Sequence, residues 1–108
     1  MNNKPTPMDI MKEICPDGMK IYLEHRDVVM DEKRFPALPR KVKLLVGIGV
    51  AASLQSSLCT LMWTKLARQA GATDAEIAEA ILVSRLMKMA TVNDTAAEAL
   101  AWLGSEKK

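Results

Sequence analysis

The chain has 108 residues, enough for one hydrophobic core but too few for two domains of ordinary size. Its 15 basic and 13 acidic residues leave a net charge of +2, and 4% of the residues are aromatic. Nucleic-acid-binding proteins usually gather basic residues on one face and add aromatic side chains for stacking, so this composition predicts no nucleic-acid partner. Apolar residues make up 49%, and a helical chain this short and apolar often completes its core with a second subunit.

The N-terminal residues are polar and include two prolines, and no apolar run typical of a secretory signal follows them. The two cysteines, Cys15 and Cys59, form neither a Cys-x-x-Cys pair nor a disulfide framework. We therefore expect a cytoplasmic protein with reduced thiols. No residue pattern predicts a metal site or a cofactor. One domain is expected over residues 1–108, with residues 1–7 and 105–108 frayed.

The first part of the chain predicts two helices and a turn. Thr6 followed by Pro7 is typical of a capped helix start, which opens a helix to about residue 14. A second helix is expected over about residues 17–33, with an apolar stripe at helical spacing. Residues 35–39 predict a turn, because each of their prolines disfavours helix at the residue before it.

The rest of the chain also predicts helices. The stretch from about Arg40 is apolar nearly all round at first, which is typical of a helix enclosed by others. Ser56 indicates a kink or a fresh helix start, and Gly71 ends the stretch. Residues 73–76 form a capping box that opens a helix to about residue 90, and residues 93–95 predict the start of a last helix. The expected fold is therefore all-α, with five to six helices.

Two features of the apolar stretch bear on its packing. Gly47 and Gly49 each cost about 1 kcal/mol relative to alanine inside a helix, so we expect another backbone to approach closely there. Residues 44–64 contain no charged residue and are long enough to cross a bilayer. Serine and glutamine side chains in the middle of this segment are costly in lipid. A buried helix pair is the preferred interpretation, and no membrane partner is expected.

Three sequence features, in this order, carry a family resemblance. Residues 38–43 read Leu-Pro-Arg-Lys-Val-Lys, an apolar helix and Cys59 follow, and residues 67–80 read Ala-Arg-Gln-Ala-Gly-Ala-Thr-Asp-Ala-Glu-Ile-Ala-Glu-Ala. Together they resemble the carboxymuconolactone decarboxylase-like family, which includes the alkylhydroperoxidase D-like proteins. The resemblance implies a compact helical domain that forms a homo-oligomer, a trimer or a hexamer, and that takes a small-molecule or peroxide ligand.

In the peroxidase branch of that family, the chemistry lies in a Cys-x-x-Cys-x-x-x-His motif and a Glu in the preceding helix. The Glu and His relay protons, the second cysteine attacks the peroxide, and the first closes a disulfide. Laid onto this sequence, these positions become Ser56, Cys59, Trp63 and, for the Glu, Leu44. The decarboxylase branch has an acid and a His near this point, and this chain has neither.

Cys59 is the candidate catalytic residue, and two interpretations of it stand side by side. If Ser56 caps the helix, Cys59 lies in the first turn, where the helix dipole favours a thiolate that a peroxide can oxidise. Turnover then needs an outside thiol or Cys15 of a neighbouring copy to release the product. The preferred interpretation is a buried, small apolar side chain.

Other candidate residues are assigned mainly structural roles. Trp63, with Ser56 and Met62, is a candidate pocket wall, but aromatic side chains at helical spacing are more often core. His25 is expected on the surface, off the apolar stripe. Glu76 and Glu79 are expected to serve the N-terminus of their helix. We assign Met87 and Met89, together with Met62, to a subunit interface in preference to an adaptable pocket.

The sequence thus predicts a family member that keeps its assembly and a small-molecule pocket but has little or no peroxidase turnover. Two alternatives stay open at this point. One is a single-cysteine thiol peroxidase, a peroxiredoxin-like antioxidant or redox protein acting through Cys59. The other is a small-molecule decarboxylase that uses residues no motif identifies.

Overall fold

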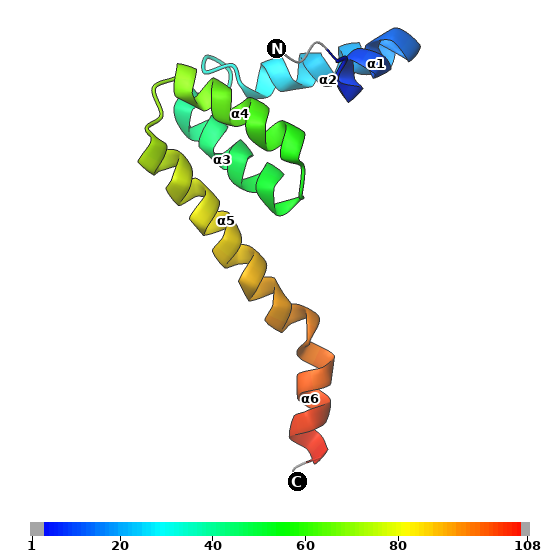
Figure 1. Cartoon of the computed structure of the whole chain (residues 1–108), viewed down its shortest axis with the longest axis vertical. Helices are drawn as coiled ribbons and strands as arrows, with labels where there is room; N and C mark the ends of the chain where they lie inside the picture. Colours follow the sequence, from blue (N-terminus) through cyan, green and yellow to red (C-terminus); the bar gives the residue numbers. More distant parts are fainter. Residues whose placement is uncertain (1–3, 107–108) are drawn as a thin grey trace. The chain divides into compact units, whose positions relative to one another are not determined.

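The computed structural model describes residues 4–106, and within them the chain is helical with no strand. Six helices follow one another (Figure 1): α1 (Pro7–Ile14), α2 (Pro16–Val29), α3 (Arg40–Ser53), α4 (Ser57–Gln69), α5 (Asp74–Thr95) and α6 (Ala97–Glu106). The all-α prediction is confirmed. Of the ends expected to be frayed, residues 1–3 and 107–108 lie outside the described residues, whereas Pro7, Ser105 and Glu106 are helical.

The chain divides into two compact units, Met1–Arg40 and Lys41–Lys108. The first unit contains α1 and α2, and its buried apolar side chain among the described residues is Met19. Thr6 caps α1 through a reciprocal pair of hydrogen bonds with Asp9, as the Thr-Pro sequence predicts. The prediction that α2 continues to residue 33 is wrong. The carboxylate of Asp31 accepts a hydrogen bond from the Lys33 backbone N–H, a local turn that competes with helix.

The second unit is built around α3, whose Leu44 and Ile48 are its most deeply buried large side chains. α3 and α4 form a hairpin (Figure 1), and the residue that turns the chain between them is Gln55, with φ of 62°. This break divides the uncharged segment 44–64 into two helices. Within the described residues, no helix has both the length and the apolar character that a membrane span requires.

The helix ends in this unit follow their sequence signals. Ser56 caps α4, Gly71 takes a positive φ of 93° after it, and Thr73 and Glu76 form the capping box of α5. The expected boundary at residues 93–95 is wrong, since α5 continues to Thr95 and α6 begins at Ala97. The hydroxyls of Thr91 and Thr95 donate to carbonyls of the preceding turn, so these polar residues are satisfied inside the helix.

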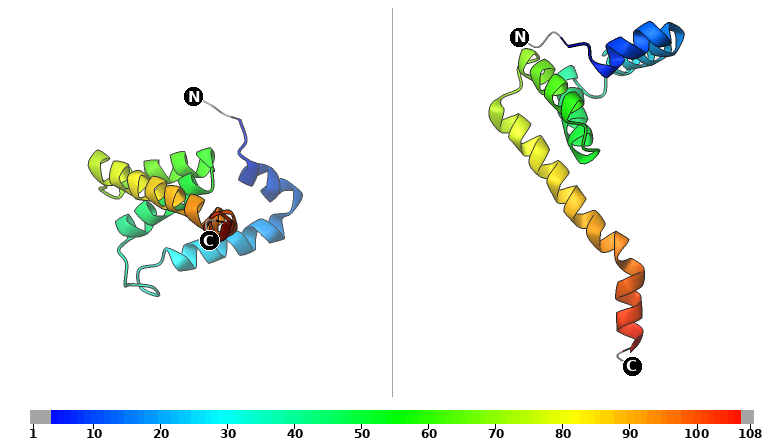
Figure 2. Two further views of the ribbon diagram at one scale, coloured as in Figure 1. Left: turned by 90° about the horizontal axis from the view of Figure 1, so that it is seen from below. Right: turned by 45° about the vertical axis from the view of Figure 1, so that its right-hand side comes forward.

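α3 and α5 run side by side in the same direction, in a register fixed by two contacts. Lys41 pairs with Glu76 near the start of both helices, and Ser84 donates a hydrogen bond to the Gly49 carbonyl two turns further along. In this register α3 ends about level with residue 88. The last two turns of α5 and all of α6 therefore extend past α3, as Figures 1 and 2 show.

A pair of glycine substitutions tests the backbone assignment. Gly71→Ala is expected to lower the free energy of unfolding by about 1–2 kcal/mol, because alanine is strained at a positive φ. Gly104→Ala is the control: it lies inside α6, and an added β-carbon meets nothing within 4 Å, so alanine is expected to stabilise by up to about 1 kcal/mol. Urea unfolding measures both, and equal effects would contradict the assignment.

Candidate functional site

Cys59 lies in the first turn of α4, and its surroundings follow from the cap of that helix. The Ser56 hydroxyl accepts a hydrogen bond from the Cys59 backbone N–H at 3.4 Å, and the Thr60 hydroxyl donates to the Ser56 carbonyl at 2.7 Å. The expectation of a fresh helix start at Ser56 is confirmed. The Cys59 side chain is exposed, so its interpretation as a buried apolar residue is wrong. The reason is its position at the hairpin end, where the first turn of α4 lies open.

Trp63 lies one turn further along α4, half-buried against α3. A β-carbon added to Gly47 would overlap the indole ring, so the absent side chain of Gly47 provides the space that Trp63 fills. At Gly47 the sequence predicts the close approach of another backbone, but the group that approaches is the Trp63 ring. At Gly49 a backbone does approach, since an added β-carbon would lie 3.6 Å from the Ala80 carbonyl oxygen.

The position that the resemblance assigns to a catalytic Glu holds Leu44, which is 1% exposed in the core of the second unit. The groups one turn from Cys59 along α4 are Ser56, Met62 and Trp63, of which none titrates near neutral pH. Met62 is 40% exposed. The cluster can thus offer a thiol and the amide donors of a helix N-terminus, but no proton relay.

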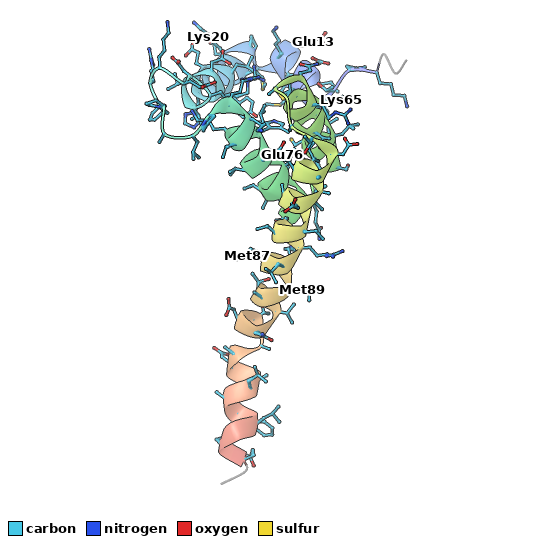
Figure 3. The ribbon with its side chains drawn as sticks, turned by 90° about the vertical axis from the view of Figure 1, so that its left-hand side faces the viewer. Glu13, Lys20, Lys65, Glu76, Met87 and Met89 are labelled. Carbon is cyan, nitrogen blue, oxygen red and sulfur yellow. The ribbon has the colours of Figure 1, made fainter. Side chains whose placement is uncertain are left out.

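The other sequence-predicted residues lie apart from this cluster along the chain. His25 is exposed on α2 in the first unit, as expected of a surface histidine, and Cys15 is exposed between α1 and α2. No group of histidine, cysteine or acidic residues within residues 4–106 is arranged to hold a metal ion. Met87 and Met89 are exposed on α5, beyond Glu76 along the helix (Figure 3).

Glu76 has the capping role expected of it, but Glu79 does not. Oε1 of Glu76 accepts the Thr73 backbone N–H at 2.8 Å, and Oε2 lies 2.9 Å from Nζ of Lys41. The Thr73 hydrogen bond, followed by the charge of Lys41, lowers the pKa of Glu76 from its ordinary value. Glu79 lies one turn later and contributes nothing to the cap.

Sequence reasoning missed an apolar groove between α3 and α5, which has a volume of about 650 Å³. Its lining residues are Val42, Leu45, Val46, Gly49, Val50, Ser53, Leu54, Glu76, Glu79, Ala80, Val83, Ser84 and Met87. The Ser84 hydroxyl donates to the Gly49 carbonyl at 2.8 Å, so its only proton is used and Ser53 must donate to Ser84 across 2.5 Å. The groove contains none of the residues around Cys59. The signal that could have revealed it is the run of valines and leucines over 42–54.

Comparison with known proteins adds a family assignment. Residues 16–103, from α2 to most of α6, match the model of the carboxymuconolactone decarboxylase family. The chain belongs to this family. Searches among curated proteins and solved structures found no match. The match to the carboxymuconolactone decarboxylase family includes α2 of the first unit and α3 to α5 of the second, and it agrees with the all-helical fold.

Gly47 and Gly49 provide a matched test of the α3–α4 contact. Gly47→Ala is expected to destabilise by about 1–3 kcal/mol, because the added methyl group must displace the Trp63 ring. Gly49→Ala places its methyl group at ordinary contact distance and gains helix propensity, so no loss of stability is expected. Thermal or urea unfolding measures both, and a Gly47→Ala variant as stable as the wild type would contradict the contact.

The lowered pKa of Glu76 predicts a pH-dependent stability difference. A lowered folded-state pKa stabilises the fold above the unfolded value, and this contribution is lost as the pH falls through the folded value. Glu76→Gln should therefore reduce the free energy of unfolding at pH 7, and the gap to the wild type should close as the pH falls below 4.5, the ordinary pKa of a glutamate. Glu13→Gln, an exposed glutamate on α1 with no part in a helix cap, is the control expected to show little change.

Proposed function

We propose that the protein is a carboxymuconolactone decarboxylase family member that has lost the peroxidase relay and acts as a self-associating helical scaffold. The observation that carries the loss of the relay is Leu44. A side chain at 1% exposure in the core neither accepts nor passes a proton, and it stands where the resemblance places the relay Glu.

The other two substituted relay positions also have structural roles that replace the catalytic ones. Ser56 uses its hydroxyl to cap α4, so it takes the place of a resolving cysteine without supplying a thiol. Trp63 fills the space beside Gly47, and an indole cannot shuttle protons at neutral pH. Each substitution thus fits a scaffold, and together they remove every partner of Cys59 in the peroxidase reaction.

Self-association is supported by the apolar surface of the second unit. The exposed large apolar side chains of α5 are Ile81, Leu82, Val83, Leu86, Met87, Met89 and Val92. α6 has no buried residue, and its Leu100, Trp102 and Leu103 are each at least half exposed. Exposed apolar patches of this extent mark interaction sites in soluble proteins. A homo-oligomer, a trimer or a hexamer, accounts for them without any other partner.

One observation favours a second candidate function. Cys59 is exposed in the first turn of α4, where a hydroperoxide can reach its sulfur. Its thiolate would attack a hydroperoxide, forming a sulfur–oxygen bond as the oxygen–oxygen bond breaks and an alcohol leaves. An external thiol would then displace water from the sulfenic acid and form a mixed disulfide, which a second thiol reduces.

Peroxide consumption with an external thiol separates the two candidates. The relay-loss proposal predicts that the wild type and Cys59→Ser consume hydroperoxide at the same background rate, and Cys15→Ser serves as the matched control. Thiol-dependent turnover that disappears in Cys59→Ser but persists in Cys15→Ser would overturn the proposal and establish the single-cysteine peroxidase. A dimedone adduct at Cys59 without turnover would indicate a redox-sensitive thiol, which leaves the scaffold role standing.

A further inference from the structure

We propose that the apolar groove between α3 and α5 of one copy receives a stripe on the outer face of α5 from a second copy. This inference rests on the self-association proposed above and assigns the two surfaces that meet. The groove is the 650 Å³ groove between α3 and α5 described above. The outer stripe consists of Leu82, Leu86 and Met89.

The outer stripe is apolar, and residues 4–106 leave about half or more of each of its side chains uncovered. Its three side chains are 48%, 61% and 64% exposed. Their spacing of four and three residues places them on one face of α5. Met89 also lies past the level at which α3 ends, so α3 cannot cover it in this register. A helix face of this kind fits an elongated groove lined by valine and leucine.

The relation between the two surfaces determines the kind of contact. α5 contributes to both surfaces. At 3.6 residues per turn, the outer stripe lies about a third of a turn around the helix from Val83 and Met87, which line the groove. The surface that inserts is therefore different from the surface that receives. A contact between unlike surfaces can be made twice across a two-fold axis or repeated around a ring, so it does not by itself set the number of copies.

Charge complementarity argues for a second copy as the occupant. The groove lining includes two carboxylates and no cation. Lys41 neutralises Glu76 and leaves Glu79, which forms no ion pair within residues 4–106. Arg85, equally without an ion pair in that range, lies three residues after Leu82 and four before Met89, beside the outer stripe.

Glu79 and Arg85 cannot pair within one copy, because they are six residues apart on the same helix and point to different sides. A second copy that inserts its outer stripe brings its Arg85 to the rim of the groove, beside Glu79. The contact thus buries the apolar stripe in the apolar groove and pairs Glu79 of one copy with Arg85 of the other.

A charge-swap series measured by sedimentation equilibrium tests this contact. Glu79→Arg and Arg85→Glu are each expected to raise the dissociation constant of the assembly at least about tenfold, because each places like charges together. The double variant reverses both charges and should return to within about threefold of the wild type. Glu13→Arg and Lys65→Glu are exposed controls with the same charge changes and no place in the groove or the stripe.

Each outcome bears on the inference. A self-associating wild type, with both single variants weakened and the double variant restored, supports it. An oligomer whose single variants match the controls, or whose double variant is weaker than either single one, overturns the groove–stripe contact and leaves self-association intact. A wild-type monomer at micromolar concentration overturns both proposals.

Discussion

The second unit depends on the packing of α3 against two helices through two glycines. Gly47 provides the space for the Trp63 ring from α4, and Gly49 lets the backbone of α5 come near while its carbonyl accepts the Ser84 hydroxyl. Leu44 and Ile48 then lie in a closed interior. Because α3 contacts both neighbours in this way, its position fixes where α4 presents Cys59 and where the groove along α5 opens.

The same register creates the apolar surface that a single copy leaves open. α5 has 22 residues and α3 has 14, so at about 1.5 Å per residue α5 is longer by about 12 Å. The surplus length, together with α6, carries leucine, methionine and tryptophan side chains into solvent. In this account the unpartnered surface serves assembly, whereas the cluster around Cys59 keeps a thiol without its relay. The proposed function therefore rests on the scaffold and its groove and not on peroxide chemistry.

Local signals in the sequence predict most of the fold, because the residues that cap a helix or end it act over three or four positions. Thr6, Ser56 and Thr73 each cap the helix that they precede, and Gly71 takes the positive φ expected of it. The end of α5 was not predictable in this way, since Thr91 and Thr95 are satisfied by their own helix. The exposure of Cys59 and the groove depend on how distant segments pack, which periodicity alone does not encode.

The central claim is that the outer surface of α5 and α6 is covered by another copy. Hydrogen–deuterium exchange measured over a range of protein concentrations tests this most directly. The account predicts that amides over residues 85–103 are protected at micromolar concentration and lose protection on dilution, while those of α3 remain protected throughout. Rapid exchange over 85–103 at every concentration, or protection that does not change on dilution to monomer, would contradict it.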